Sequence, residues 1–373
     1  MGQNLIRIDS NITTMSQNLR IINWNVTTLD RSLSDWFAFF TAHYDWIILP
    51  DQIFWALKII QFFYYPILAI VGVTVNLLTI GILSRGKCGL SKCVSCYLVA
   101  MSAADLLVII LDLILRHIPI VYWEQFQFLR SIDVCNFHAV LLFAATDCSV
   151  WFTVTFTFDR FVAICCQKLR SRYCSEKMAS VVLGAVTVLS CLKNIIWYFM
   201  LTGPYSLLNI PWFCDATPDV LLSRVWGTIE LLHHILTPGL PFVLILLLNA
   251  LTVRHISVSS RGRRRLRDHS SGKSRRDPEM ESRRKSIILL LVISLNFILL
   301  WAALMVYSIW FRMWFLDATF AYPHVFLQEL GFMLQLLSCC TNTTIYAVTQ
   351  TRFREQLKNV LKCPFTAIVQ FIG

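Results

Sequence analysis

The stretch that decides the fold runs CNFHAVLLFAATDCSVWFTVTFTFDRFVAICC, from Cys135 to Cys166. Its interior is almost wholly apolar and is interrupted by Asp147 and Ser149. At about 1.5 Å of rise per residue, the roughly 25 residues from Cys135 to Arg160 would span about 37 Å as a helix, more than the ~30 Å hydrocarbon core of a bilayer. The stretch therefore predicts one long transmembrane helix, with a cysteine at one membrane surface and an arginine at the other.

The composition of the whole chain is that of a membrane protein. Of the 373 residues, 56% are hydrophobic and 15% are charged, and the mean hydropathy is +0.61. The charges cluster between long apolar runs, which is typical of a helical protein that crosses the membrane several times. The net charge of +11 lies mainly in loops on one side of the predicted membrane. It therefore indicates orientation by the positive-inside rule and not nucleic-acid binding.

Seven apolar runs are long enough to cross a bilayer. The polar N-terminus shows no signal-peptide pattern, so we expect the first span to act as its own insertion signal. Sequons at Asn11 and Asn25 would be glycosylated only on the lumenal side, which favours an extracellular segment over residues 1–52. We expect a transmembrane domain over 53–348, with spans at about 53–83, 94–116, 131–166, 178–201, 224–256, 286–311 and 322–348.

The loop charges support this orientation independently. The outer loop at about 202–223 contains acidic residues and no Lys or Arg, whereas the loops assigned to the cytoplasm are basic. The segment 257–285 has no apolar periodicity and predicts a flexible cytoplasmic loop. Residues 349–373 predict an amphipathic helix on the membrane surface and a short cytoplasmic tail. Within it, Cys363 is either palmitoylated or a free buried thiol.

The thirteen cysteines do not indicate a disulfide-rich scaffold. In this topology only Cys135 and Cys214 fall on the outer, oxidising side, and the others lie within helices or face the reducing cytosol. We therefore expect a Cys135–Cys214 disulfide that ties the outer loop to the central helix.

Polar residues within the spans are candidates for function, because they are costly in a bilayer and face the interior of the bundle. One set lies near mid-membrane. A buried carboxylate with hydroxyl and amide neighbours would hold a sodium ion or a structured water network. The alternative is that Asp105 is merely hydrogen-bonded or protonated in the core. The set consists of Asn76, Asp105, Ser149, Asn296 and Asn342.

A second polar set lies nearer the outer half. For Asp147, a ligand contact and a structural pair with Lys193 or a histidine both stay open. Since adjacent residues point about 100° apart on a helix, at most one of two neighbouring histidines faces a central cavity. The sequence contains no pattern typical of a metal site, a phosphate loop or a nucleophile–base pair, which argues against an enzyme. The set consists of Asp112, Asp147, Lys193, Glu230, His233 and His234.

In their joint order these motifs resemble the rhodopsin-like (class A) G-protein-coupled receptors, over residues of about 53–363. Each motif is weak alone, but the order across seven spans is specific. The resemblance implies an all-α membrane protein, a seven-transmembrane helix bundle with a short amphipathic cytoplasmic helix. It rests on Gly72, Asn76, Leu98, Ala103-Ala104-Asp105-Leu106, Cys135, Ser149, Asp159-Arg160-Phe161, Cys214, Pro241, Phe297, Trp301 and Asn342-Thr343-Thr344-Ile345-Tyr346.

The resemblance also implies roles. Arg160 would be held by Asp159 at rest and released to the G protein when the sixth span swings outward, and Tyr346 would then move in to support it. A sodium site would be formed by Asp105, Ser149 and Asn342. An activation switch beneath the ligand would be formed by Phe297 and Trp301.

Some positions depart from the family pattern. Phe161 stands where tyrosine is usual, and Arg283 stands where an acidic partner for Arg160 is often found. Proline is absent after Trp301, where Ala302-Ala303 stand, and Thr343 replaces the usual proline of the seventh span. We therefore hypothesise that the resting lock is incomplete and that basal activity is measurable. Leu142 argues against a biogenic amine, since amine receptors carry an aspartate there. Leu336 likewise argues against an opsin, which needs a lysine.

Within the family, several runs are similar to the G-protein coupled receptor 139 group of orphan receptors, notably Ser91-Lys92-Cys93, Ala145-Thr146-Asp147-Cys148 and Cys191-Leu192-Lys193-Asn194. That group is associated with aromatic amino acids or related small ligands. A mainly apolar or aromatic ligand with one polar contact fits equally well, as does a peptide. The pocket candidates are Leu142, Phe143, Thr146, Asp147, His233, His234, Trp301, Leu304, Met305, Phe332 and Gln335.

The sequence thus predicts a plasma-membrane receptor that is not an enzyme and has no cofactor beyond an allosteric sodium ion. Its expected partners are a heterotrimeric G protein, arrestin, receptor kinases, a ligand and the lipid bilayer, without nucleic acid. A transporter or channel that uses the buried carboxylates is the rival interpretation, although the spans show no internal repeat. A membrane enzyme would need clustered metal ligands, which the scattered histidines do not provide.

Overall fold

The computed structural model describes residues 49–86, 88–122, 132–205, 214–216, 223–267, 278–317 and 319–360. The chain divides into two units, Met1–Ala56 and Leu57–Gly373. The described part of the first unit, residues 49–56, is the beginning of helix α3. The second unit contains the bundle that is described below.

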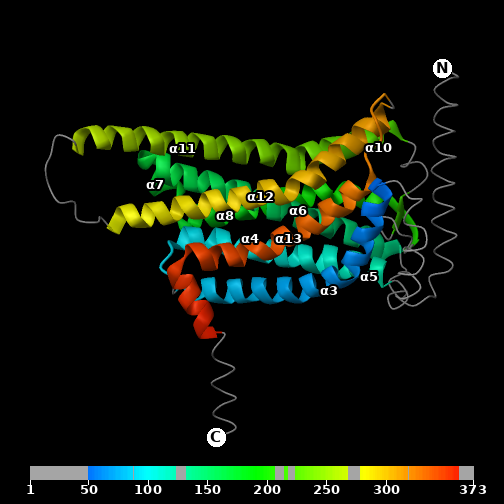
Figure 1. Cartoon of the computed structure of the whole chain (residues 1–373), viewed down its shortest axis with the longest axis horizontal. Coiled ribbons are helices and arrows are strands. Elements are labelled where there is room, and N and C mark those ends of the chain that lie inside the picture. Colours follow the sequence, from blue (N-terminus) through cyan, green and yellow to red (C-terminus); the bar gives the residue numbers. More distant parts are fainter. Residues whose placement is uncertain are drawn as a thin grey trace, which may run out of the picture. The chain divides into compact units, whose positions relative to one another are not determined.

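The described residues form seven helical spans (Figure 1). The prediction of an all-α membrane bundle is therefore confirmed. Some spans include a short 3-10 or π segment and so carry more than one label. In order they are α3 (Leu49–Ser84); α4 (Lys92–Val108), η2 (Ile109–His117) and α5 (Ile118–Val121); α6 (Ile132–Cys165); α8 (Glu176–Asn194) and η4 (Ile195–Phe199); α10 (Arg224–His234), η5 (Ile235–Gly239) and α11 (Leu240–Arg267); α12 (Pro278–Leu316); and α13 (Val325–Thr349).

Three smaller elements accompany the spans. Helix α7 (Gln167–Tyr173) connects α6 to α8, and residues 351–360 form a helix that turns away from α13 at the red end of Figure 1. Strand β1 (Leu201–Tyr205) pairs with the antiparallel strand β2 (Cys214–Ala216) in a two-stranded sheet. This sheet, in the loop between the fourth and fifth spans, was not predicted.

Serine caps explain why three spans begin where they do. Ser91 accepts a hydrogen bond from the backbone nitrogen of Val94 at the start of α4. Ser175 does the same at α8 and Ser223 at α10. A serine oxygen in this position satisfies one of the backbone N–H groups that the first helical turn leaves without a partner.

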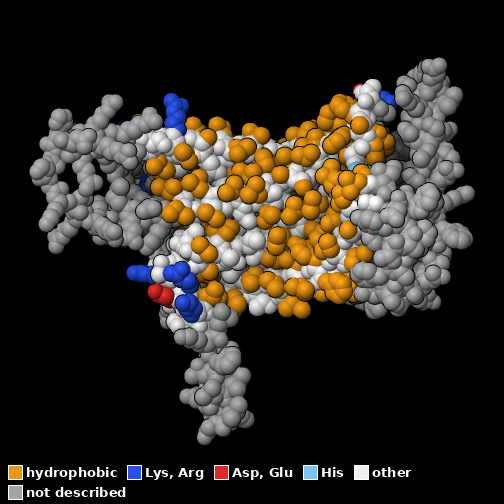
Figure 2. Space-filling model, in the orientation of Figure 1, with side chains coloured by type: hydrophobic (Ala, Val, Ile, Leu, Met, Phe, Trp, Pro, Cys, Tyr) orange, Lys and Arg blue, Asp and Glu red, His pale blue; other side chains and the backbone are white. Residues whose placement is uncertain are grey.

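The surface of the bundle matches a lipid environment. Figure 2 shows hydrophobic side chains over most of the described surface on one face. Large apolar side chains such as Ile70, Val188 and Leu299 are exposed. Six spans within the described residues are long and apolar enough to cross a membrane. The seventh, α13, is less apolar because it carries buried polar residues such as Glu329, Gln335 and Asn342.

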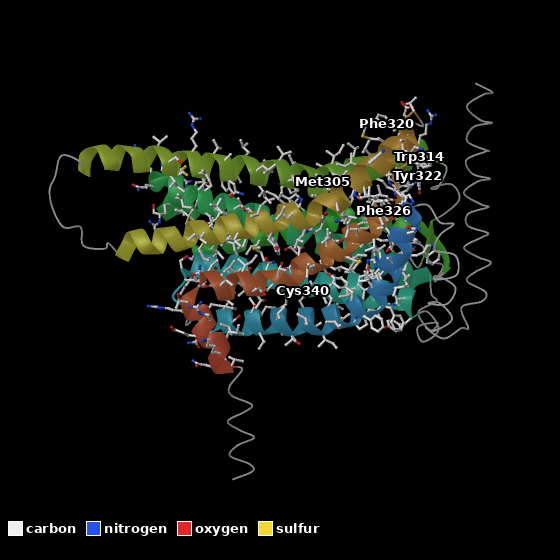
Figure 3. The ribbon with its side chains drawn as sticks, viewed as in Figure 1. Met305, Trp314, Phe320, Tyr322, Phe326 and Cys340 are labelled. Carbon is white, nitrogen blue, oxygen red and sulfur yellow. The ribbon has the colours of Figure 1, made fainter. Side chains whose placement is uncertain are left out.

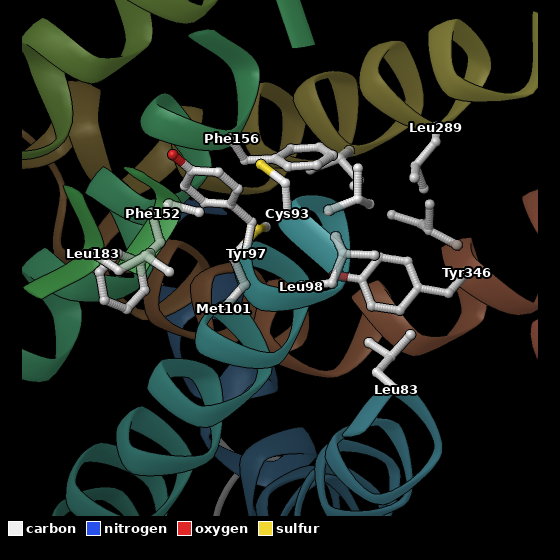
Figure 4. Packing of buried hydrophobic residues seen from close by; sticks show 14 of the residues in the cluster. Leu83, Cys93, Tyr97, Leu98, Met101, Phe152, Phe156, Leu183, Leu289 and Tyr346 are labelled. Carbon is white, nitrogen blue, oxygen red and sulfur yellow. The ribbon is translucent and has the colours of Figure 1, made fainter. Parts of the chain in front are cut away.

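One hydrophobic cluster packs the end of the bundle that contains Arg160. Leu98, Met101 and Tyr97 of α4 meet Phe152 and Phe156 of α6 (Figure 4). Leu83, Leu289 and Tyr346 bring the first, sixth and seventh spans to the same cluster. The first, third, sixth and seventh spans thus pack around α4 at this end.

Two predictions of local structure need adjustment. The predicted loop at 257–285 is shorter, because α11 continues to Arg267 and α12 begins at Pro278. Extending an existing helix is favourable at each added residue, and arginine is a good helix former. The predicted amphipathic helix is present at 351–360, but Phe353 is fully buried against the bundle and does not face lipid.

Candidate functional site

A polar centre joins the second, third and seventh spans. Ser149 Oγ donates a hydrogen bond of 2.6 Å to Asp105 Oδ1, and Asn342 Nδ2 donates one of 2.7 Å to Asp105 Oδ2. Asp105 is only 3% exposed, so these two donors take the place of water around its carboxylate. The structure thus brings together the three residues predicted to form a sodium site.

A cavity of about 20 Å³ lies beside Asp105. This volume is enough for one water-sized guest. Carboxylate, hydroxyl and amide oxygens line it, and such hard oxygen ligands suit a cation such as sodium. The residues present therefore fit the ion that the sequence predicts. The lining consists of Asp105, Ser149, Thr153, Ile293, Asn296, Phe297, Trp301, Ser338 and Asn342.

Asn76 belongs to the same depth of the bundle but does not line this cavity. Its side-chain amide donates to the backbone oxygens of Gly72 and Cys339, both at 2.9 Å. It therefore ties the first span to the seventh. Among the predicted mid-membrane residues, Asn296 does line the cavity, and its side-chain oxygen accepts a hydrogen bond of 3.1 Å from Thr341.

The predicted activation switch forms one wall of the cavity. The rings of Phe297 and Trp301 lie 5.6 Å apart. Trp301 Nε1 donates a 3.0 Å hydrogen bond to Ser338 Oγ, which in turn donates to the backbone oxygen of Gln335 at 2.7 Å. The sixth span is thereby linked to the seventh through an indole and a serine. The role of Ser338 was missed in the sequence, where one serine in an apolar run carries little signal.

Arg160 lies near the end of the third span and is hydrogen-bonded to its neighbour Asp159. Its Nε donates a 3.0 Å hydrogen bond to Asp159 Oδ2, and its Nη2 bonds the same oxygen. Arg160 is 8% exposed. The predicted pairing of the two residues is present.

Tyr346 lies inside the hydrophobic cluster at this end and is fully buried. Its ring lies edge-on to Phe353, with 5.9 Å between centroids. Within the described residues its hydroxyl has no hydrogen-bond partner. A buried hydroxyl without a partner is costly, so this tyrosine gains a hydrogen bond if it moves toward a polar group.

Some of the pocket candidates lie in an aromatic cluster between the third, fourth and fifth spans. The ring of His233 lies 5.0 Å from Phe143 and 4.9 Å from Trp197, and the last two rings are 4.6 Å apart. His233 therefore faces Phe143 of α6. Trp197 was not predicted, because a tryptophan near the end of a span is also expected from membrane anchoring.

Another candidate, Phe332 of α13, contacts Arg116 and His117 of the second span. Its ring centroid is 4.8 Å from the guanidinium carbon of Arg116 and 5.0 Å from the ring of His117. Arg116 pairs with Asp112 at 2.6 Å. Arg116 was missed, although its position four residues after Asp112 on a helix favours such a pair.

Of the remaining candidates, Leu142 and Thr146 lie on α6, and Leu304 and Met305 lie on α12. Leu142 is buried, and Thr146, Leu304 and Met305 are half-buried. Met305 lies on α12, about one turn from Trp301 (Figure 3). Figure 3 also labels Trp314 and Tyr322, whose rings are 4.7 Å apart between α12 and α13.

The predicted outer set resolves into separate ion pairs. Asp147 pairs with Lys193, whose Nζ lies 2.6 Å from Asp147 Oδ2. Of the two roles predicted for Asp147, the structure shows the ion pair with Lys193. Glu230 pairs with Arg312, which also covers the ring of Phe311 at 5.0 Å.

Some predictions concern positions outside the described part of the chain. These are the sequons at Asn11 and Asn25, the thiol of Cys363, and the side chains of Cys135, Cys214 and Arg283. Only the backbone of Cys135, in α6, and of Cys214, opposite Tyr205 in the two-stranded sheet, is described. The disulfide, the glycosylation and the palmitoylation therefore stay predictions.

Comparison with known proteins agrees with this architecture. Two curated relatives are both named G-protein coupled receptor 39. The protein from Bos taurus is 26% identical over 160 residues, which cover 42% of this chain and 34% of the relative. The protein from Mus musculus is 24% identical over 157 residues, with the same shares. These matches span about a third of each relative's length.

A family model matches far more of the chain. It is that of the 7 transmembrane receptors of the rhodopsin family, and it matches residues 75–346. The match begins in α3 and ends at Tyr346 of α13, so it includes the polar centre, Arg160 and the cavity beside Asp105. Together with the seven helical spans, it shows that this chain is a multi-pass membrane protein that belongs to the rhodopsin family of seven-transmembrane receptors.

Proposed function

We propose that this protein is a plasma-membrane receptor that converts the binding of an extracellular ligand into activation of a heterotrimeric G protein. Its N-terminus is extracellular and its 257–285 segment is cytoplasmic, as the loop charges predict. The observation that carries the proposal is the position of Arg160. It is held by Asp159 at the end of the third span, in a chain of this receptor family.

The mechanism is a population shift between two arrangements of the bundle. At rest Arg160 is bonded to Asp159, and Tyr346 is packed beneath Phe353. An agonist shifts the equilibrium only by its greater affinity for the open arrangement. In that arrangement Arg160 leaves Asp159 and becomes available to the G protein, and Tyr346 exchanges its apolar surroundings for a polar partner.

Sodium would act on the same equilibrium. When bound, the ion supplies a positive charge beside the Asp105 carboxylate. The residues that would hold it are Asp105 and Ser149, with Asn342 and Asn296 at the cavity wall. Trp301 lines the same cavity, so a rearrangement of the predicted switch changes the ion's surroundings directly.

The ligand that fits best is small, largely aromatic and provided with one polar group. Phe143, Trp197 and His233 form an aromatic cluster to receive it. The neighbouring charges of Asp147 and Glu230 are each paired within the protein. This chemistry agrees with the likeness to the G-protein coupled receptor 139 group, and we propose membership of that group.

The test is a G-protein activation assay on intact cells with several G-protein readouts. L-tryptophan, L-phenylalanine and their amides are the probes, and Arg160→Ala at matched surface expression is the control. We expect a response in the parent receptor and none in the variant. An equal response from Arg160→Ala would refute the mechanism.

Basal activity provides a second arm of this test. We expect ligand-free signalling above that of cells without the receptor, because Arg283 stands where an acidic residue would strengthen the resting state. Signalling equal to that of empty cells, at verified surface expression, would contradict this part of the proposal.

A further inference from the structure

An ion pair between the buried Asp147 and the half-buried Lys193 joins the third and fourth spans and reaches the fifth. Lys193 Nζ lies 2.6 Å from Asp147 Oδ2 and donates a 3.1 Å hydrogen bond to Thr237 Oγ1. Trp151 Nε1 donates to the same hydroxyl oxygen at 3.1 Å. Thr237 lies in η5, where α10 meets α11. Two donors from other helices therefore converge on one hydroxyl in the fifth span.

The same network continues to the aromatic cluster. Asn194 Nδ2 donates a 2.6 Å hydrogen bond to Asp147 Oδ2, and Asn194 Oδ1 accepts one of 2.8 Å from Trp197 Nε1. The Trp197 ring lies against Phe143 and His233. The polar residues are thus connected, contact by contact, to the rings that we propose receive the ligand.

The burial of the pair determines its energetic role. The Asp147 side chain is 1% exposed and that of Lys193 is 30% exposed. A buried ion pair adds little net stability compared with apolar residues of the same shape, but removing one partner leaves a costly unpaired charge. A function for this pair therefore lies in the geometry that it imposes on neighbouring helices.

We propose that Lys193 is a positioning residue that couples the aromatic cluster to the fifth span. With Asp147 as its counter-ion, it holds Thr237 and favours the resting arrangement, in which Arg160 is bonded to Asp159. A ligand that moves Trp197 would also shift Asn194 and Asp147, which are linked to it. The hydrogen bond from Lys193 to Thr237 would then weaken. This inference rests on the proposed receptor function.

Four variants of the full-length receptor separate positioning from simple structural support. Lys193→Met removes the charge and the donor but keeps an unbranched side chain. Asp147→Asn removes the opposite charge. The double variant Asp147→Asn/Lys193→Met leaves no unpaired buried charge and removes the Lys193 donor to Thr237, while the donor from Trp151 remains. Lys193→Arg keeps both the charge and the donors.

The first readout is the apparent melting temperature in detergent, which does not depend on any G protein. We expect each single charge removal to lower it by about 5 °C, and the double variant to recover most of that loss. Thr237→Val combined with Lys193→Met should lower the melting temperature by less than the sum of the two single losses, because both substitutions break the same hydrogen bond. Additive losses in this pair would overturn the proposed link.

The second readout is basal G-protein activation at matched surface expression. We expect the double variant, although stable, to signal about fivefold more than the parent, since the hydrogen bond from Lys193 to Thr237 is lost. Lys193→Arg should stay near the parent level. Basal signalling of the stable double variant equal to that of the parent would show a purely structural role and overturn the proposal.

A matched control is the ion pair of Lys58 with Glu329, at 2.9 Å in the first and seventh spans. Lys58→Met should lower the melting temperature as well, but additively with Thr237→Val. If the losses of Lys58→Met and Thr237→Val are also non-additive, then non-additivity reflects general destabilisation and not a specific contact. That result would also overturn the proposal. If neither the parent nor any variant activates a G protein, the proposed function fails, while the melting cycle still decides whether Lys193 and Thr237 are coupled.

Discussion

The thiol of Cys93 donates a hydrogen bond to Oδ1 of Asp159 across 3.3 Å. The other oxygen of this carboxylate, Oδ2, accepts both hydrogen bonds from Arg160. Both oxygens are therefore engaged, one by the second span and one by the arginine. Cys174 adds a contact of 3.6 Å from its thiol to the backbone oxygen of Asp159. Burial, followed by the nearby Asp159, raises the pKa of Cys174 to about 11, so its thiol stays protonated near neutral pH.

We predict that Cys93→Ala raises basal signalling, because Asp159 loses a donor that fixes its orientation toward Arg160. A hydrogen bond of this kind contributes about 1 kcal/mol, which corresponds to about a fivefold change in an equilibrium. Cys93→Ser keeps a donor and should signal like the parent. Basal G-protein activation at matched surface expression measures both, and an equal rise in the two variants would indicate a packing effect instead.

A second prediction concerns sodium and Asp105. Replacing KCl by NaCl at equal ionic strength should raise the apparent melting temperature of the detergent-solubilised receptor by about 3 °C, since a ligand that binds the folded state stabilises it. Asp105→Asn should abolish the sodium-dependent shift, because the variant lacks the negative charge. Asn76→Ala is the control, as Asn76 lies outside the cavity. A shift that persists in Asp105→Asn would place the ion elsewhere.

A third prediction tests the packing of α12 on α13. A Cβ atom on Gly331 would lie 2.8 Å from Leu304 Cα and 2.9 Å from Leu304 N. Backbone atoms cannot move aside as a side chain does, so Gly331→Ala should destabilise the receptor by about 1–3 kcal/mol.

Gly81→Ala is the matched control, since nothing lies within 4 Å of its added Cβ. Alanine there should be neutral or stabilising by up to ~1 kcal/mol. Thermal unfolding of both variants would show the difference, and equal stability of the two would contradict the packing described.

A fourth prediction concerns the link between Trp301 and Ser338. Ser338→Ala removes the acceptor of the indole N–H and should cost about 1–3 kcal/mol, the usual penalty for a buried polar group without a partner. Ser338→Thr keeps the acceptor and should restore stability. Chemical or thermal unfolding in detergent gives the comparison. An alanine variant as stable as the parent would mean that the indole finds water in the cavity.

The sequence predicts the bundle well because hydropathy and charge act over whole spans. Twenty apolar residues bounded by basic loops leave few alternatives to a transmembrane helix. The exact ends are less well determined, as α11 shows by continuing to Arg267 beyond the predicted 256. There the end depends on local helix propensity, not on the membrane.

The polar centre was predictable for a similar reason. A carboxylate such as Asp105 within a span must find donors, and Ser149 and Asn342 were the available ones at the same depth. The ion pairs of Asp147, Asp112 and Glu230 were harder to assign. Each has more than one possible partner at a similar depth, and the choice depends on helix rotation. Single-sequence periodicity does not fix that rotation, so Arg116 and Arg312 were missed.

The polar character of α13 has a consequence for how the protein is made. A carboxylate that enters the bilayer alone costs about 2.5–3.5 kcal/mol at the middle of a helix, and a polar amide without a partner is costly as well. Glu329 is bonded to Lys58 and Gln61 of the first span, and Asn342 to Asp105 of the second. The ribosome produces those partners first. When the last span enters the membrane from the translocon, the spans that carry its polar partners are already made. Its integration therefore depends on packing against those spans and not only on its own hydropathy.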